Sequence, residues 1–341
     1  MKTLTANYQN KNVKIHFDDN LVNKNWNFLD DTCRYLVITD QNLNKLYHQQ
    51  LNTIPNLLGI VPLLPGESSK SLDTYRIIVT ILQEYQLTKD DVLIAFGGGV
   101  ITDICGFVAG TFKRGIRFIS VPTSLIGMVD ASIGGKCALN LNSVKNQIGL
   151  IYHPVEIIIS TSFLKTLDKR QIISGMAEIA KIAIIKDAKM FDELCKLPVD
   201  YCTDLSLISN LIYKAICLKI KITEKDEFDE HKRHILNFGH TIGHIIESKS
   251  EFELTHGEAI AMGMIAEISN QSIEHILTSL LKKLGLLTKP IDRIDYLAQI
   301  NNDKKIKNKS IDLVYLDSIG HGKLKKYKLE NLNNEQFWKE Y

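Results

Sequence analysis

Five short apolar runs, each bounded by turn residues, occur in the chain up to about residue 165. Their continuous apolar character predicts strands that are buried on both faces of a sheet. A helical pattern over Lys70–Tyr85 lies between two of them. Strands that alternate with helices are typical of a parallel, doubly wound sheet. The runs are Tyr35–Thr39, Leu58–Leu63, Val92–Phe96, Phe118–Val121 and Ile157–Ser160.

The pattern changes at about Asp168, beyond which long helical periodicities dominate and Gly and Pro become sparse. We expect two domains: an α/β, Rossmann-like domain over residues 1–167 and an all-α domain over residues 168–341. The cleft between two such domains is where an active site is expected. The predicted helices of the second domain are Arg170–Ile185, Leu205–Lys225, Lys232–Lys249, His256–His275 and Thr278–Leu284.

Composition excludes several classes of protein. The 341 residues include 41 Lys and Arg against 39 Asp and Glu, a balance that argues against a nucleic-acid binder. No apolar stretch approaches the length of a membrane span, and the first residues lack the apolar core of a signal peptide. The 6 cysteines form no C-x-x-C pair, which disfavours a thiolate zinc site and indicates a reducing, cytoplasmic setting.

The strongest turn signal is the apolar run from Val92 into Gly97-Gly98-Gly99. Glycines between a strand and a helix let the backbone approach a phosphate at the helix N-terminus. We expect Asp103 in the first turn of that helix. The turn is not the usual dinucleotide motif, because Thr102 stands where G-x-G-x-x-G requires glycine, and a tight turn without a ligand is the alternative.

Two other segments of the first half have the same ambiguity. Asp40 and Asn42 follow the first strand, where their side chains could bind a ribose or form an ordinary Asx turn. Thr123 and Ser124 follow another strand, and Lys136, Lys145 and Asn146 lie further along the chain. These cations suit a bound phosphate, although the full P-loop motif is absent.

A polar stripe with two histidines marks the second half. Arg233, Asn237, His240 and His244 are spaced four, three and four residues apart, which predicts one face of a single helix. Two histidines at this spacing can share a metal or face one ligand.

Further charged groups interrupt apolar helix faces. They are Glu178, Lys181, Lys219 and, at a helix start, His256. Each alone fits a satisfied core polar group, or a snorkelling lysine in the case of Lys219. Together they require compensation, since an unpaired buried charge costs several kcal/mol. We therefore expect a metal or an anionic ligand among them.

These segments resemble the 3-dehydroquinate synthase family. The resemblance covers about residues 35 to 320. It runs through Gly97–Asp103, Arg114-Gly115, Val121–Ser124, Asp130–Lys136, Lys145-Asn146, Ala177–Lys181, Leu236–His244 and His256–Glu258.

The resemblance implies a cofactor and a metal. Zn²⁺, with Co²⁺ as a possible substitute, would be held by Glu178, His240 and His256, and His244 would serve the substrate and proton transfer instead. NAD would lie on Asp40, Asn42, Glu67, Lys70, Gly98, Gly99, Val100, Asp103, Thr123, Ser124, Lys136, Lys145, Phe163 and Thr166.

The resemblance also implies a substrate pocket and a homodimer. The pocket would be lined by Asp130, Lys136, Lys145, Asn146, Lys181, Lys219, Arg233, Asn237 and His244, and closed by Lys304 or Lys305. Arg114 would reach the phosphate site of a neighbouring subunit.

The implied reaction converts 3-deoxy-D-arabino-heptulosonate 7-phosphate into 3-dehydroquinate and phosphate. It passes through transient oxidation at C5, phosphate elimination, re-reduction and aldol closure. The alternatives are a metal-dependent polyol dehydrogenase of the same fold, a related sugar-phosphate cyclase, and a metabolite-binding relative without activity.

Overall fold

The computed structural model describes residues 2–19, 26, 28–142, 144–250, 253–286 and 310–328. The chain divides into two compact units, residues 1–167 and 168–341. Among the described helices, none has the length and apolar character needed to cross a bilayer.

The first unit is built on a seven-stranded sheet of order β1-β2-β9-β6-β5-β3-β4. The β1–β2 pair is antiparallel, and the other neighbours are parallel. All five predicted strands are confirmed, and the hairpin of β1 and β2 makes the sheet mixed. The strands are β1 (Lys2–Tyr8), β2 (Lys11–Phe17), β3 (Tyr35–Asp40), β4 (Leu57–Leu63), β5 (Val92–Gly97), β6 (Arg117–Pro122) and β9 (Glu156–Ile159).

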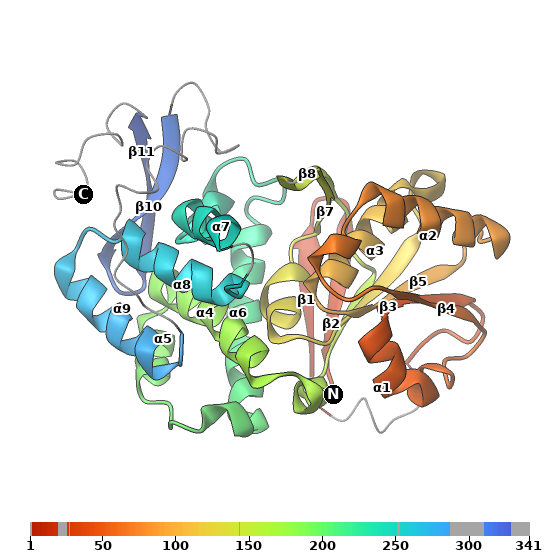
Figure 1. Ribbon diagram of the computed structural model, residues 1–341, viewed down its shortest axis with the longest axis horizontal. Coiled ribbons are helices and arrows are strands. Elements are labelled where there is room, and N and C mark those ends of the chain that lie inside the picture. Colours follow the sequence, from red (N-terminus) through yellow and green to blue (C-terminus); the bar gives the residue numbers. More distant parts are fainter. Residues whose placement is uncertain are drawn as a thin grey trace. The chain divides into compact units, whose positions relative to one another are not determined.

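Helices cover both faces of this sheet. Figure 1 shows α1 (Gln41–Leu51) on one face and α2 (Leu72–Glu84) and α3 (Gly99–Thr111) on the other. Asp40 caps α1 by accepting the Leu43 N–H at 2.9 Å, and Ser71 caps α2. Apolar side chains of α2 and α3 pack on β3, β4 and β5 to form the core. The glycine-rich turn thus joins a buried strand to a buried helix.

The segment that joins β6 to β9 contains structure that the sequence analysis did not assign. Gly127–Ala131 forms one turn of π-helix, η4. It is followed by an antiparallel hairpin of β7 (Lys136–Leu141) and β8 (Val144–Ile151), which lies on α3. Two short 3₁₀ turns, η2 (Glu67–Ser69) and η5 (Thr161–Thr166), follow β4 and β9.

The second unit is mainly helical, as predicted, and its central helix is α4. This helix is buried along most of its length and packs against α5, α6, α8 and the β10–β11 hairpin. The hairpin is an antiparallel addition to the all-α prediction. The elements are α4 (Lys169–Lys186), α5 (Ala188–Cys195), α6 (Leu205–Thr223), η7 (Lys232–Asn237), α7 (His240–Lys249), α8 (His256–Glu267), α9 (Gln271–Lys283), β10 (Ser310–Ser318) and β11 (His321–Lys328).

The prediction of one helix over Lys232–Lys249 is wrong. A 3₁₀ turn ends at Asn237, and α7 begins at His240 after Gly239, whose φ of +76° is left-handed. Glycine adopts that conformation without the steric cost of a Cβ. The four residues of the polar stripe therefore do not share a helix face.

Two smaller boundaries also differ. The helix predicted over His256–His275 ends at Glu267, and α9 begins at Gln271, where Asn270 accepts two backbone N–H groups as its cap. Asp103 is the fifth residue of α3, beyond its first turn, because Gly98 caps that helix.

Candidate active site

Three potential metal ligands converge in the second unit. The Glu178 Oε1 atom lies 3.2 Å from His256 Nε2 and 3.4 Å from His240 Nε2. The ligand atoms of this Glu-His-His set all lie within 4.8 Å of one another. One carboxylate and two imidazoles are the donors of many catalytic zinc sites, which keep further positions open. The chemistry of the donor set therefore fits a Zn²⁺ or Co²⁺ ion.

The opposite nitrogen of each imidazole also has a partner. His240 Nδ1 lies 3.1 Å from the Phe238 carbonyl oxygen, and His256 Nδ1 lies 3.7 Å from Glu247 Oε2. A partner at Nδ1 orients an imidazole so that its Nε2 faces the metal. Both rings are thus held with Nε2 toward Glu178.

The electrostatics of the cluster favour a positive charge between these groups. Burial raises the pKa of Glu178, but the charges of Lys181, 2.6 Å away, and His256 outweigh it, so the pKa falls well below its usual value. Burial lowers the pKa of His256, but Glu178 and Glu247 outweigh that effect and raise it to about 9. A divalent cation supplies such a charge.

Close helix packing brings the ligands together. Gly263 of α8 lies against the start of α7, where a Cβ would overlap the backbone oxygen of Gly239. The first turn of α8 carries His256 and is held by a capping box between Thr255 and Glu258. Arg170 of α4 donates to both oxygens of Glu258, at 3.0 and 2.7 Å. The N-terminus of α8 is thereby tied to the helix that carries Glu178.

His244 belongs to a second set of three potential metal ligands, with Glu247 and His256, which shares His256 with the first set. Its ring centroid lies 5.2 Å from that of His240 and 6.0 Å from that of His256. His244 is exposed, and its ring nitrogen comes within 4.8 Å of ligand atoms of Glu247 and His256.

The remaining predicted residues of this unit are buried or half-buried cations and an amide. Lys219 of α6 is 5% exposed and Arg233 of η7 is 3% exposed. Asp226 accepts the Arg233 N–H at 2.9 Å, and the Arg233 side chain donates to the Glu227 carbonyl. The η7 turn, which also carries Asn237, packs against α4 and α6. Lys304 and Lys305 lie outside the described residues.

In the first unit the glycine-rich turn is tightly built. A Cβ on Gly97 would lie 2.6 Å from Ile101, so the residue that ends β5 must be glycine. The Thr123 N–H donates to the Gly97 carbonyl at 3.0 Å, and Ser124 Oγ accepts the Gly127 N–H at 3.1 Å. The turn therefore lies beside Thr123 and Ser124.

A second group of predicted residues meets around Lys70. Its buried ammonium contacts Asp103, and it donates to Asn146 Oδ1 at 2.5 Å. Burial raises the pKa of Asp103, against the opposing charge of Lys70. Asn140, which the sequence analysis did not single out, donates to Glu67 at 2.8 Å and accepts the Asn146 N–H at 2.9 Å. The network joins the η2 turn, α3 and the β7–β8 hairpin.

The other predicted residues of this unit have varied surroundings. Asp40 caps α1, as an ordinary Asx turn would, and Asn42 lies in the first turn of that helix. Phe163 is buried against Tyr47 and Phe96, and Thr166 lies 2.7 Å from the Tyr47 hydroxyl. Asp130 lies in the π-helical turn, Lys145 is half-buried, and Lys136 and Arg114 are exposed.

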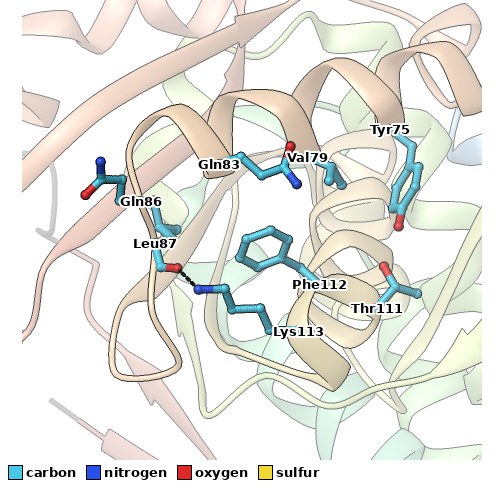
Figure 2. Close-up of a pocket in the computed structure, with 8 residues that line it drawn as sticks. All are labelled: Tyr75, Val79, Gln83, Gln86, Leu87, Thr111, Phe112 and Lys113. Carbon is cyan, nitrogen blue, oxygen red and sulfur yellow. Dashed lines mark hydrogen bonds between the residues drawn. The ribbon is translucent and has the colours of Figure 1, made fainter.

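A separate hollow of about 550 Å³ opens between α2 and the end of α3. Figure 2 shows Lys113 at its edge, donating to the Leu87 carbonyl at 2.6 Å. Its lining consists of apolar, amide and hydroxyl side chains with a single lysine, and none of the predicted site residues belongs to it.

Two buried carboxylates in the second unit escaped the sequence analysis. Glu247 faces His256, and Glu267 accepts backbone N–H groups at the start of α7. Glu267 interrupts the otherwise apolar stretch Ile260–Ile268, and that interruption was the available signal, whereas Glu247 is followed by Ser248-Lys249-Ser250 and had no such signal.

Comparison with known proteins assigns the class. Solved structures of two sugar-phosphate cyclases share the fold. One is a 2-deoxy-scyllo-inosose synthase complexed with carbaglucose-6-phosphate, NAD+ and Co2+. It has a TM-score of 0.86 and is 25% identical, and the match covers 98% of this chain and 99% of that one. A 2-epi-5-epi-valiolone synthase from Streptomyces hygroscopicus subsp. jinggangensis 5008, with NAD+ and Zn2+ bound, has a TM-score of 0.85 and 23% identity, covering 97% and 96%.

Sequence comparison is more specific. Models of the 3-dehydroquinate synthase N-terminal and C-terminal domains match residues 60–174 and 175–306. The 3-dehydroquinate synthase of Enterococcus faecalis (strain ATCC 47077 / OG1RF) is 38% identical over 307 residues, 85% of each chain. The chain belongs to the 3-dehydroquinate synthase family and is a lyase of the shikimate pathway.

Proposed function

We propose that the chain converts 3-deoxy-D-arabino-heptulosonate 7-phosphate into 3-dehydroquinate and phosphate, with NAD and Zn²⁺ or Co²⁺ bound. The observation that carries the proposal is the convergence of Glu178, His240 and His256 in a chain of this family. These three residues would hold the metal. The turn at Gly98, Gly99 and Val100 would hold NAD, with the other cofactor residues named above.

The chemistry that these groups supply when bound is acidification of a substrate hydroxyl by the metal and reversible acceptance of a hydride by the nicotinamide. In the first unit, Lys136, Lys145 and Asn146 would bind the phosphate that leaves, and Asp130 would orient the substrate. Charge-assisted hydrogen bonds from lysine are the strong contacts for such an anion.

Residues of the second unit would orient the rest of the substrate. Lys219 and Arg233 are buried cations suited to a carboxylate, and Asn237 to a hydroxyl. His244, exposed beside the two metal-ligating histidines, would move a proton. Lys181 would keep Glu178 ionised, because its ammonium lies 2.6 Å from Glu178 Oε2. We further propose that Lys304 or Lys305 closes the site, and that Arg114 serves a neighbouring subunit in a homodimer.

Metal removal tests the proposal. A strong chelator is expected to abolish release of phosphate from the heptulosonate phosphate, and Zn²⁺ or Co²⁺ should restore it with 3-dehydroquinate as the identified product. Glu178→Gln should lose activity at least a thousandfold while remaining folded by circular dichroism. Glu193→Gln, which changes an exposed carboxylate on α5 paired with Lys214, is the matched control and should keep full activity. Full activity in protein shown by elemental analysis to be metal-free would contradict the metal centre.

The same assay separates the alternatives. A polyol dehydrogenase would release no phosphate, and a different sugar-phosphate cyclase would act on another heptulose or hexose phosphate in preference. A metabolite-binding relative would bind the substrate without turnover.

A further inference from the structure

Helices α7 and α8 carry the two histidines of the metal centre at matching positions. His240 is the first residue of α7 and His256 is the first residue of α8. Each helix also carries a buried glutamate toward its other end, Glu247 in α7 and Glu267 in α8. Each glutamate reaches the start of the partner helix, so the two helices run antiparallel and each supports the ligand of the other.

The first contact secures His240. Glu267, 1% exposed, accepts the N–H of Gly239 at 2.7 Å, of Thr241 at 3.0 Å and of Ile242 at 3.2 Å. The residue before α7 is Gly239, which has no side chain with which to cap the helix. The first N–H groups of a helix need acceptors, and an anion there also meets the positive end of the helix dipole. Glu267 therefore fixes the turn from which His240 projects.

The second contact secures His256. Glu247 Oε2 lies 3.7 Å from His256 Nδ1, while His256 Nε2 faces Glu178 at 3.2 Å. A carboxylate at Nδ1 holds the proton there and leaves Nε2 as the metal-binding atom.

We propose that Glu247 and Glu267 are positioning residues of the metal centre, which cross-brace α7 and α8 so that His240 and His256 present Nε2 to one ion. This inference rests on the metal centre of the proposed function. Helix capping alone does not need a buried carboxylate: α9 of the same unit is capped by Asn270, whose side-chain amide is neutral. Burying a charge at each contact has a cost, and a cation that both histidines bind offsets it.

The test measures metal binding in the full chain, by competition for Zn²⁺ with a chelating dye and by the visible absorption spectrum of the Co²⁺ form. Glu247→Ala and Glu267→Ala are each expected to weaken Zn²⁺ binding about tenfold or more, and to change the Co²⁺ spectrum. Glu247→Gln should recover most of the affinity, because its amide oxygen still faces His256 Nδ1. Glu267→Gln keeps one acceptor oxygen, should fold where alanine fails, and should lie between alanine and the unsubstituted protein.

The control separates positioning from stability. Asp187→Ala removes the side chain that caps α5 by accepting the Met190 N–H at 3.0 Å. This variant should lower the melting temperature yet keep its Zn²⁺ affinity within twofold and its Co²⁺ spectrum unchanged. If the Glu247 and Glu267 variants keep the unsubstituted affinity and spectrum while the unsubstituted protein binds Zn²⁺ tightly, the cross-brace is overturned and the proposed function stands. If the unsubstituted protein binds neither ion, the metal centre and the cross-brace are both overturned.

Discussion

At the scale of single residues, the candidate site works through partners that remove freedom from each functional side chain. Glu178 is held ionised by Lys181, His240 Nδ1 lies 3.1 Å from the Phe238 carbonyl oxygen, and the Glu247 carboxylate faces His256 Nδ1 at 3.7 Å. In the first unit, Lys70 restrains its neighbours in a similar way, because its ammonium contacts both Asp103 and Asn146. Because these side chains are already held in place, they lose less conformational entropy when the substrate binds.

Lys145 tests the assignment of the phosphate-binding residues. Lys145→Ala is expected to weaken binding of the heptulosonate phosphate about 10- to 100-fold, because a charge-assisted hydrogen bond contributes about 1.5–3 kcal/mol. Calorimetry on metal-free protein, which cannot turn over, would measure the substrate and NAD⁺ separately, and NAD⁺ affinity should change much less. Lys89→Ala, at an exposed lysine of the same unit, should alter neither affinity. Equal weakening of both ligands by Lys145→Ala would instead assign Lys145 to the cofactor site.

At the scale of elements, the break between η7 and α7 separates His240, the proposed metal ligand, from Arg233 and Asn237. The periodicity of the sequence predicted one continuous helix there, because a glycine within an apolar pattern is compatible with a helix. Two long-range facts decide otherwise: Gly263 allows α8 to approach the break, and Glu267 supplies the acceptors that the new helix end needs. Neither fact is local in the sequence, so periodicity could not find the break.

The ionisation of Asp226 makes the stability of the fold around η7 depend on pH. Its carboxylate accepts the N–H groups of Glu230, His231 and Arg233, at 2.9, 2.8 and 2.9 Å. Burial raises its pKa, but these hydrogen bonds outweigh burial and lower it. A carboxylate whose pKa is lower in the folded state stabilises the fold above its unfolded pKa of about 3.9, and that stability is lost as the pH falls through the folded value.

Asp226→Asn is therefore expected to lower the melting temperature by a constant amount between pH 5 and 7, through loss of about 1–3 kcal/mol. The difference from the unsubstituted protein should shrink below pH 4 and vanish as Asp226 becomes protonated. Thermal denaturation across this pH range measures it. Asp192→Asn, at an exposed position on α5, should track the unsubstituted protein throughout. A difference for Asp226→Asn that persists undiminished at the lowest pH would contradict the role assigned to its ionised form.

At the scale of the whole molecule, the sequence predicted the elements whose signals are local. The five apolar strands of the first unit and α4 of the second were predicted within one or two residues, because buried strands and amphipathic or apolar helices leave a continuous pattern. The hairpins β1–β2, β7–β8 and β10–β11 were missed, because they lack the continuous apolar runs that marked the buried strands. Exposed and buried residues alternate along β1 and β2, and β8 has no buried residue. Spacing alone also gave no reason to prefer His256 over His244 as a metal ligand. That choice came from the family resemblance. In the structure Glu178 contacts His240 and His256, while His244 lies near Glu247 and His256.

The central claim is that the chain eliminates phosphate and closes a ring, with NAD⁺ as a recycled catalyst. The most direct measurement follows nicotinamide absorbance and free phosphate together, with the heptulosonate phosphate in large excess over NAD⁺. The hydride taken from C5 must return to C5, so we expect many phosphates released per NAD⁺ and little accumulated NADH. NADH that rises in step with product and stops when NAD⁺ is exhausted, or the absence of phosphate release, would contradict the account.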